Sequence, residues 1–368
     1  MINNFIRKIL RYKSKGKVFV GLSGGVDSSV AAALLKKEGY DVTGVFIKGW
    51  HPDFMPCPWE EDRRDAMRVA ASLDIPFKTL NLEKEYEEGV ASYMIDEYKK
   101  GRTPNPDVMC NKIIKFGIFL DKAKEMGADF IATGHYVRLK KDEKTNEMKF
   151  LSGVDKNKDQ SYFLWTLRQD QLRYSLFPVG DYEKKEIRKI AKKYNLPTAE
   201  KKDSQGICFM GQVEMKDFLK HYIKNKKGDI LDKKGNIIGN HEGAYFYTLG
   251  QRHGFEITKK GIDDKPYYVV DKDIEKNTLV VDHSKINKES QNNIEIEGLN
   301  WVSGESPDLK SKYQARIRYR QPLQNCQIVE DDNGVIRILF NKPQEAVTPG
   351  QSLVLYQGEE CLGGGVIK

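Results

Sequence analysis

The sequence contains few cysteines, and no two of them have the spacing of a metal site. The five cysteines are Cys57, Cys110, Cys208, Cys326 and Cys361, and no Cys-x-x-Cys occurs. Their odd number and wide separation argue against a disulfide framework and against a zinc finger. We therefore expect that any functional cysteine in this chain acts as a reactive thiol.

Long apolar runs are also missing. No stretch of about 18 apolar residues is available to cross a membrane, and residues 1–11 lack the small-residue cleavage site of a signal peptide. We therefore expect a cytoplasmic protein that has no membrane partner.

Acidic residues are outnumbered by basic ones. The chain has 61 Lys and Arg against 53 Asp and Glu, a net charge of +8, which favours a polyanionic partner. Charged runs such as that at 181–230 more often form solvated helix faces, so charge alone leaves nucleic-acid binding open. The length of 368 residues exceeds one ordinary core and predicts two or three domains.

The segment 21–29, Gly-Leu-Ser-Gly-Gly-Val-Asp-Ser-Ser, lacks the lysine of a Walker A loop and the spacing of Gly-x-Gly-x-x-Gly. It follows an apolar run at 18–20 and precedes an alanine- and leucine-rich run at 30–35. The first run predicts a buried strand and the second a helix. The segment is therefore expected to be the loop between them.

Glycine gives this loop a capacity to bind anions. Ser23, Gly24 and Gly25 can turn successive backbone N–H groups inward beside a helix N-terminus. We expect a cradle for phosphate. For Asp27 and Ser28 the alternative is helix capping alone.

Two further predicted strands point to the same crevice. The strand at 41–47 ends at Ile47, and the strand at 129–136 ends in Gly134 and His135. In open α/β sheets the ligand lies outside the carboxyl ends of the strands. Ile47 is thus a candidate neighbour of adenine and His135 of the ligand, and the alternative for both is a structural role in the core.

The segment 102–112 presents a carboxylate and a thiol from a stiff support, because two prolines straddle Asn105. Asp107 and Cys110 are three residues apart, one turn of a helix that begins at Asp107. Asp107 is a candidate for proton transfer, and Lys112 for stabilising the thiolate. The alternative is an Asp N-cap followed by a buried cysteine.

Cys208 is a second candidate for a reactive thiol. Gly206 precedes Cys208, whose neighbours are apolar, which suggests a sulfur on a loop that can be shielded or exposed; a simply packed cysteine is the alternative. Cys57, beside Pro58, has no basic neighbour, and we expect no catalytic role for it.

The pattern changes after residue 215, where short β-prone runs alternate with turns. We expect an α/β catalytic domain with a doubly wound parallel sheet at 1–212. Two small β domains, both barrels, are expected to follow at 213–288 and 289–368.

Residues 315–320 alternate so that Arg316, Arg318 and Arg320 are predicted to line one strand face. Such a face suits phosphate or base contacts, although a solvated face is the commoner meaning. A phosphate loop, two separated thiols and a basic body with β domains together suggest exchange of oxygen for sulfur on an RNA base.

Eight segments in one order carry a resemblance that covers essentially the whole chain. They are Gly-Leu-Ser-Gly-Gly-Val-Asp-Ser, Thr-Pro-Asn-Pro-Asp-Val-x-Cys-Asn, Ala-Thr-Gly-His-Tyr, Lys-Asp-Gln-Ser-Tyr-Phe-Leu, Asp-Ser-Gln-Gly-Ile-Cys-Phe, Tyr-Thr-Leu-Gly-Gln-Arg, Arg-Tyr-Arg-Gln and Thr-Pro-Gly-Gln-Ser. The sequence resembles the tRNA-specific 2-thiouridylase family of the ATP-pyrophosphatase (PP-loop) superfamily. The resemblance implies sulfur insertion at carbon 2 of the wobble uridine (position 34) of lysine, glutamate and glutamine tRNAs.

The resemblance also implies roles for individual residues. Asp107 would transfer the proton, Cys110 would be the nucleophile and Cys208 the persulfide carrier. ATP would contact the PP-loop, which comprises Gly21, Leu22, Ser23, Gly24, Gly25, Val26, Asp27 and Ser28, together with Ile47 and Gly134. The target base would meet Asn105, Pro106 and Asp107, and the tRNA would contact His135, Lys158, Asp159, Gln160, Arg318, Tyr319 and Gln351.

The implied reaction needs ATP with Mg²⁺, which adenylate the uracil oxygen and make it a leaving group. The persulfide sulfur then attacks carbon 2, and either a Cys110–Cys208 disulfide or free hydrosulfide results; the sequence leaves both routes open. A cysteine desulfurase or a sulfur-relay protein would supply the sulfur. Two rival functions are an amidating synthetase, which needs no paired thiols, and a non-catalytic RNA-binding protein, which would release no pyrophosphate.

Overall fold

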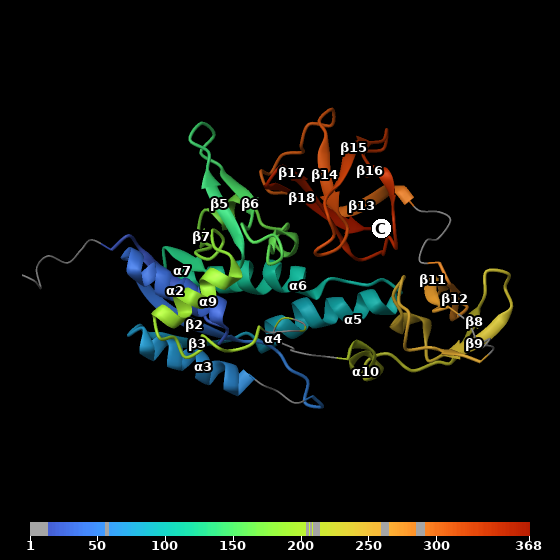
Figure 1. Cartoon of the computed structure of the whole chain (residues 1–368), viewed down its shortest axis with the longest axis horizontal. Helices are drawn as coiled ribbons and strands as arrows, with labels where there is room; N and C mark the ends of the chain where they lie inside the picture. Colours follow the sequence, from blue (N-terminus) through green and yellow to red (C-terminus); the bar gives the residue numbers. More distant parts are fainter. Residues whose placement is uncertain are drawn as a thin grey trace, which may run out of the picture.

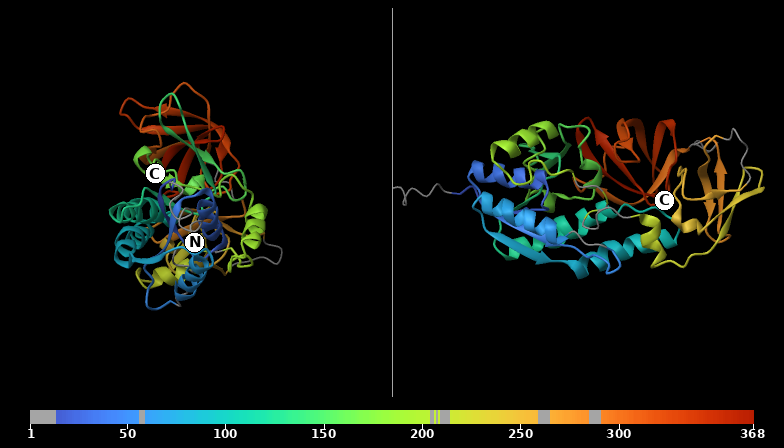
Figure 2. Two further views of the ribbon diagram at one scale, coloured as in Figure 1. Left: turned by 90° about the vertical axis from the view of Figure 1, so that its left-hand side faces the viewer. Right: turned by 60° about the horizontal axis from the view of Figure 1, so that its bottom comes forward.

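The computed structural model describes most of the chain as an elongated molecule, with an α/β part at one end and two β sheets beyond it (Figures 1 and 2). The described residues are 14–55, 59–203, 206, 208, 214–258, 265–284 and 291–368. Cys57, the N-terminal segment and most of the residues around Cys208 lie outside these ranges.

A five-stranded parallel sheet organises the α/β part. Its order is β3 (Phe77–Asn81), β2 (Asp41–Lys48), β1 (Lys17–Gly21), β4 (Phe130–Ala132) and β7 (Ser175–Leu176). The order reverses between β1 and β4, which is where doubly wound sheets bind ligands. The predicted fold class is confirmed, and the sheet places the PP-loop and Gly134 on the two sides of this point.

Helices cover both faces of the sheet because the side chains of β1 alternate. Val18 and Val20 pack against one layer and Phe19 against the other. The first layer contains α2 (Val26–Glu38), α3 (Trp59–Ser72) and α9 (Lys184–Lys193). Within the described ranges, no helix has both the length and the apolar character needed to cross a bilayer.

The second layer consists of two helical runs that change their winding along their length. One joins α4 (Glu83–Tyr86), the π-helix η1 (Glu87–Ala91) and α5 (Ser92–Lys99). The other joins α6 (Pro106–Met109), the π-helix η2 (Cys110–Ile118) and α7 (Phe119–Glu125). π-Helical segments bond residue i to i+5 and are frequent at functional sites.

The second run begins earlier than the sequence predicts. The helix starts at Pro106, and the side chain of Asn105 accepts a hydrogen bond of 3.3 Å from the Val108 amide. Asn105 is therefore the N-cap and proline occupies the first helical position, a favoured arrangement. The alternative in which Asp107 caps the helix is wrong, and its carboxylate is available for other contacts.

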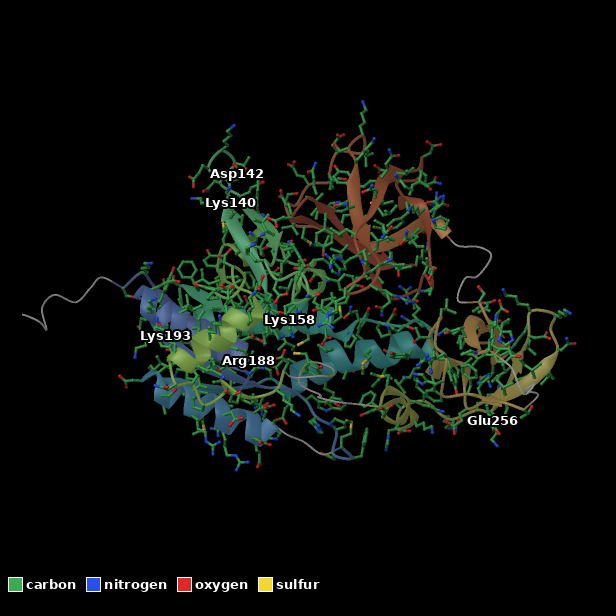
Figure 3. All side chains as sticks on the ribbon, in the orientation of Figure 1. Lys140, Asp142, Lys158, Arg188, Lys193 and Glu256 are labelled. Atoms are coloured by element: carbon green, nitrogen blue, oxygen red, sulfur yellow. The ribbon has the colours of Figure 1, made fainter. Side chains whose placement is uncertain are left out.

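Shorter elements complete this part of the chain. The sequence at 138–150 predicts an exposed hairpin, which is present as β5 (Val137–Lys141) and β6 (Met148–Ser152), and Figure 3 shows Lys140 and Asp142 toward its far end. The sequence at 162–165 predicts a helix, whereas the structure has a 3₁₀ turn, η3 (Ser161–Phe163). The two remaining short helices are α8 (Gln169–Leu172) and α10 (Met215–Lys220).

The central sheet has the order β10 (Glu256–Ile257), β9 (Ile237–His241), β8 (Gly228–Leu231), β12 (Thr278–Asp282) and β11 (Tyr268–Asp273). The β-prone run at 244–249 is not a strand. Residues Ala244–Phe246 form a 3₁₀ turn, η4, whose Ala244 and Phe246 are buried.

The C-terminal strands close into an antiparallel barrel, as expected. Their order is β13 (Gln291–Trp301), β16 (Ile336–Gln344), β15 (Gln324–Glu330), β14 (Tyr313–Arg316), β17 (Ser352–Gln357) and β18 (Glu360–Ile367), and β13 pairs with β18. The hairpin extends this sheet, because β6 pairs with β18 at Leu151 and Glu360.

The predicted row of arginines is wrong. Strand β14 ends at Arg316, which is buried and pairs with the buried Asp159 at 3.4 Å. The chain then turns, and Arg320 has a φ of 63°. Arg316, Arg318 and Arg320 therefore share no strand face, because the alternation of the sequence continues past the end of the strand.

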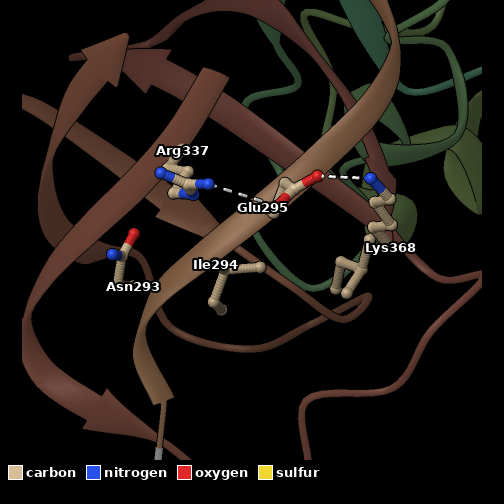
Figure 4. A pocket seen from close by; sticks show the side chains of 6 residues that line it. Asn293, Ile294, Glu295, Arg337 and Lys368 are labelled. Carbon is tan, nitrogen blue, oxygen red and sulfur yellow. Dashed lines mark hydrogen bonds and ion pairs between the residues drawn. The ribbon is translucent and has the colours of Figure 1, made fainter. Parts of the chain in front are cut away.

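A shallow hollow of about 280 Å³ lies on the barrel wall (Figure 4). Glu295 within it pairs with Lys368 at 2.6 Å and with Arg337 at 3.6 Å. Because these charges satisfy one another, the hollow is better explained as the anchor of Lys368 on the barrel than as a binding site.

Candidate active site

A pocket of about 1070 Å³ lies at the point where the strand order of the parallel sheet reverses. It is lined by most of the expected ATP contacts and by Asp107 and Cys208. The expected residues among its lining are Gly21, Leu22, Ser23, Gly25, Val26, Asp27, Ser28, Ile47, Gly134, Asp107, Cys208, His135, Lys158, Gln160 and Tyr319. One space thus joins the phosphate cradle to a thiol.

The PP-loop is held in shape by backbone conformation and by one hydroxyl. Gly24 has a φ of 75°, and a Cβ there would lie 2.4 Å from the Asp62 carbonyl oxygen, so only glycine fits. The Ser28 hydroxyl accepts a hydrogen bond of 3.2 Å from the Ser23 amide and donates one to the Gly25 carbonyl. Because Gly25 is the N-cap of α2 and no side chain caps the helix, capping does not account for Asp27 and Ser28.

Gly134 closes the other side of the cradle. A Cβ on this glycine would lie 2.6 Å from the Ser28 amide nitrogen and 2.7 Å from the Asp27 carbonyl carbon. The end of β4 and the start of α2 therefore touch through backbone alone.

Asp27 is engaged by two residues that sequence analysis missed. Tyr136 donates a hydrogen bond of 2.6 Å to Asp27 Oδ1, and Lys184 Nζ lies 2.8 Å from both carboxylate oxygens. Lys184 is the first residue of α9, far away in the sequence. The basic residues of this helix indicated a charged surface, but no local pattern indicated which lysine faces the PP-loop.

Lys184 also connects the PP-loop to the segment that leads to Cys208. Asp203 accepts from Lys184 at 2.8 Å, from Lys158 at 2.5 Å and from Arg188 at 2.7 Å; Figure 3 labels Lys158 and Arg188. Burial opposes ionisation, but the hydrogen bonds from Lys158 and Lys184 prevail and lower the pKa of Asp203 to about 2. The carboxylate thus anchors the start of that segment.

The two expected functional cysteines meet beneath the pocket. The Cys110 thiol is fully buried and forms a hydrogen bond with the thiol of Cys208, which is partly buried. Asp107 Oδ1 accepts a hydrogen bond of 3.0 Å from the Cys208 amide, and Tyr86 donates one of 2.7 Å to the Cys208 carbonyl. The carboxylate and both sulfurs therefore form one cluster.

The two thiols differ in acidity. The hydrogen bond from Cys110, assisted by the charge of Lys115 and opposed by burial, lowers the pKa of Cys208 to about 7. Burial raises the pKa of Cys110 well above its usual range and also raises that of Asp107. Cys208 is therefore the thiol that ionises first.

The cation beside the thiols is Lys115, whereas sequence analysis proposed Lys112. Lys112 is exposed, and Lys115 lines the pocket and forms a hydrogen bond with the Cys208 side chain. The prediction named Lys112, the lysine nearest to Cys110 in the sequence, whereas Cys110 and Lys115 lie one turn apart in the π-helical winding of η2.

His135 is buried on the pocket wall. Its Nδ1 lies 2.8 Å from the Thr133 hydroxyl, and burial together with the nearby Lys115 holds its pKa well below the usual range. The imidazole is therefore neutral near pH 7 and offers a hydrogen bond rather than a charge.

Aromatic rings form another part of the lining. The centroids of Phe163 and Tyr319 are 4.5 Å apart, and the Arg320 guanidinium lies 5.0 Å from the Tyr319 ring. The adjacent Asn111 donates a hydrogen bond of 3.1 Å to the Phe163 carbonyl. Such rings can stack on an unpaired base.

Other expected site residues do not line the pocket; these are Gly24, Asn105, Pro106, Cys110, Asp159, Arg318 and Gln351. Asp159 is buried and accepts hydrogen bonds from Ser161 and from the Gly153 amide. Arg318 donates to the Ala346 carbonyl at 2.7 Å. Gln351 donates to the carbonyls of Thr103 and Pro104 at 2.8 and 3.2 Å.

Comparison with protein families gives three consecutive matches. Residues 16–212 match the tRNA methyl transferase HUP domain, 216–283 the tRNA methyl transferase PRC-barrel domain and 291–367 the aminomethyltransferase β-barrel domain. Among solved structures, a 4-thiouridine synthetase–RNA complex with bound ATP matches with a TM-score of 0.33 and 21% identity, over 56% of this chain and 50% of that one. A TM-score this low carries no argument.

Curated relatives match over nearly their full length. A tRNA-specific 2-thiouridylase from Hydrogenovibrio crunogenus is 48% identical over 95% of this chain and 93% of its own. Another from Francisella tularensis subsp. novicida is 48% identical over 95% of this chain and 99% of its own. At this identity and coverage, the resemblance that the ordered sequence segments indicated is confirmed, and the chain belongs to the tRNA-specific 2-thiouridylase family.

Proposed function

We propose that this chain uses ATP to replace the 2-oxygen of the wobble uridine with sulfur in lysine, glutamate and glutamine tRNAs. The observation that carries the proposal is the single pocket that joins the PP-loop to Asp107 and Cys208. An enzyme that only adenylates its substrate has no need of paired thiols at the far end of its nucleotide site.

The first step would activate the uracil oxygen. The 2-oxygen attacks the α-phosphorus of ATP, pyrophosphate leaves, and the oxygen becomes bonded to AMP. The PP-loop would hold the phosphates, and Mg²⁺ bound with the nucleotide would neutralise their charge. Asp27 lines the pocket beside them, and Lys184 and Tyr136 hold both of its oxygens.

The second step would exchange oxygen for sulfur. Cys208 carries a persulfide received from a cysteine desulfurase or a relay protein, and its outer sulfur attacks carbon 2 while AMP departs with the oxygen. The Cys110 thiolate then attacks the inner sulfur, which forms a Cys110–Cys208 disulfide and releases 2-thiouridine. Asp107, whose pKa is raised by burial, is suited to hold or accept a proton in this sequence.

The contact between the thiols supports the disulfide route over free hydrosulfide. Cys110 already forms a hydrogen bond with Cys208, so the two sulfurs can bond with little movement. A reductant would then restore the thiols, as the cytoplasm can.

Pocket geometry supports RNA contacts for Lys158, Gln160, His135 and Tyr319. The tRNA would approach from the side on which the aromatic rings line the pocket. We propose residues 1–212 as the catalytic domain, with 213–288 and 289–368 as the β domains that accompany it.

The test is sulfur incorporation into an unmodified glutamate tRNA transcript. The protein, ATP, Mg²⁺ and a desulfurase with cysteine are incubated with the transcript, and the wobble nucleoside is identified by mass spectrometry. We expect sulfur to replace oxygen with the wild type and not with Cys208→Ser or Cys110→Ser. Non-reducing peptide mapping of the wild type after one turnover should show the disulfide.

Cys326→Ala is the matched control, because Cys326 lies in the barrel core, away from the pocket. It should retain full incorporation. Absence of sulfur in the wild-type reaction, with AMP formed on another acceptor, would contradict the proposal. Sulfur incorporation that survives Cys110→Ser would be consistent with the proposed reaction but would exclude the disulfide route.

A further inference from the structure

We propose that Lys115 is a catalytic residue that holds the Cys208 sulfur in its anionic form, so that Cys208 can accept sulfur from the donor. Lys115 lines the pocket, is partly buried, and forms a hydrogen bond with the Cys208 side chain. The assignment rests on the proposed function, in which Cys208 carries the transferred sulfur.

The winding of η2 is what brings the ammonium group to the sulfur. In an α-helix the residues on the face of Cys110 are Ile113 and Ile114, whereas the i to i+5 bonding of η2 places Lys115 one turn after Cys110. The π-helix packs against η1, where a Cβ on Gly89 would meet Ile113 at 3.0 Å. The two π-helices are therefore closely packed next to the turn that carries Lys115.

The other charged and titratable groups around Cys208 come from three elements. Asp107 on α6 and Cys110 on η2 touch it, and Tyr86 on α4 binds its carbonyl. His135 near Lys115 is neutral. Asp107 opposes the thiolate and Tyr86 adds no positive charge, so the cation in this cluster is Lys115.

The step that requires an ionised Cys208 is the transfer of sulfur from the donor to this cysteine. The Cys208 thiolate attacks the outer sulfur of the donor persulfide, the new sulfur–sulfur bond forms on Cys208, and the donor leaves as a thiolate. A protonated Cys208 cannot make this attack. A cation in hydrogen-bond contact favours the ionised form, typically by one pKa unit or more.

The experiment measures the ionisation of Cys208 directly. The full chain is alkylated with iodoacetamide across a range of pH, and the rate at Cys208 is followed by peptide mass. We expect the wild-type midpoint near 7 and that of Lys115→Met at least about one unit higher. Loading of Cys208 by glutathione persulfide should then slow about fivefold or more at neutral pH and recover at a pH about two units higher.

Lys115→Arg, which keeps the charge, should retain the wild-type midpoint. Lys112→Met removes an exposed lysine of the same helix and should change nothing. A wild-type midpoint in Lys115→Met, or slow loading that raised pH does not rescue, would overturn the assignment. A wild type that loads sulfur yet never thiolates tRNA would instead overturn the proposed function.

Discussion

At the scale of single residues, Gly134 is the point at which the nucleotide site depends on the absence of a side chain. Its Cα faces the backbone of Asp27 and Ser28, and an added Cβ would lie 2.6 Å from the Ser28 nitrogen. Gly134→Ala must therefore push the start of α2 away from β4. We expect ATP affinity to fall about tenfold or more and stability to fall by about 1–3 kcal/mol, as measured by calorimetric titration and thermal unfolding.

Gly39→Ala at the other end of α2 is the matched control. Gly39 has a φ of 94°, and a Cβ there would meet no atom within 4 Å. Backbone strain alone should lower the free energy of unfolding by about 1 kcal/mol. The affinity for ATP should not change. Equal effects of the two substitutions on ATP affinity would mean that Gly134 acts through stability and not through the PP-loop.

Single residues also show which parts of the candidate site can be predicted from the sequence. The PP-loop and β4 were predictable, because each depends on a short pattern of apolar residues and glycines, although β4 ends at Ala132, before Gly134. Local sequence also indicated Asp107, Cys110 and Cys208 as candidates, and the resemblance implied their roles. Their meeting, and the contacts of Lys184 and Tyr136 with Asp27, depend on tertiary structure that no local pattern contains.

At the scale of elements, α9 is tied to the segment before Cys208 by Asp203. Lys184 and Arg188 on α9 pair with Asp203, as does Lys158. Asp203→Asn leaves three cations without their shared anion. We expect a loss of about 1–2 kcal/mol at neutral pH, reduced from the full ion-pair value because the carboxylate is partly exposed; thermal unfolding measures it.

The pH dependence of this loss has a defined sign. Because the folded pKa of Asp203 is lowered to about 2, its stabilising contribution is complete above the unfolded pKa of about 4. The contribution is lost as pH falls through about 2. The difference in melting temperature between wild type and Asp203→Asn should therefore shrink across this range.

Glu200→Gln provides the comparison, since Glu200 pairs with Lys192 while 82% exposed. It should leave the melting temperature unchanged. A difference between wild type and Asp203→Asn that stayed constant from neutral to acid pH would show that the charge of Asp203 contributes nothing.

The prediction of helices and strands was limited by its dependence on a regular spacing of residues. The sequence predicts helices at about 83–100 and at 112–126, but not the π-helical sections η1 and η2, because hydrophobic periodicity assumes one winding throughout. The same assumption does not reveal that Lys115 lies one turn after Cys110. In the same way, alternation at 315–320 predicted a continuing strand, whereas burial of Arg316 against Asp159 and the turn at Arg320 end it.

At the scale of the whole molecule, the C-terminal barrel supports the segment that enters the active site. The Gln351 amide donates to the carbonyls of Thr103 and Pro104, and the Thr103 amide donates to the Pro349 carbonyl at 2.8 Å. Arg102 adds ion pairs with Glu97 and, on the barrel, Glu297. The barrel therefore fixes the chain immediately before Asn105.

Gln351→Ala tests this support. We expect single-turnover thiolation to slow about tenfold, because a small displacement of the segment that leads to Asp107 is costly for catalysis, while the Kd for tRNA stays the same. Filter binding and rapid-quench measurements separate the two quantities.

Gln327→Ala, on the exposed face of β15, is the control and should alter neither quantity. A weaker Kd for tRNA with an unchanged rate would contradict the supporting role and favour the direct RNA contact that the family resemblance implies for Gln351.

The hairpin β5–β6 belongs to the first half of the chain, yet it joins the sheet whose last strand is β18. Arg138 and Lys156 both pair with Glu359, next to that strand. During synthesis, β6 therefore leaves the ribosome long before its partner exists and must wait as an unpaired edge. An unpaired edge is open to other chains, so the nascent protein is vulnerable to aggregation until β18 has been translated.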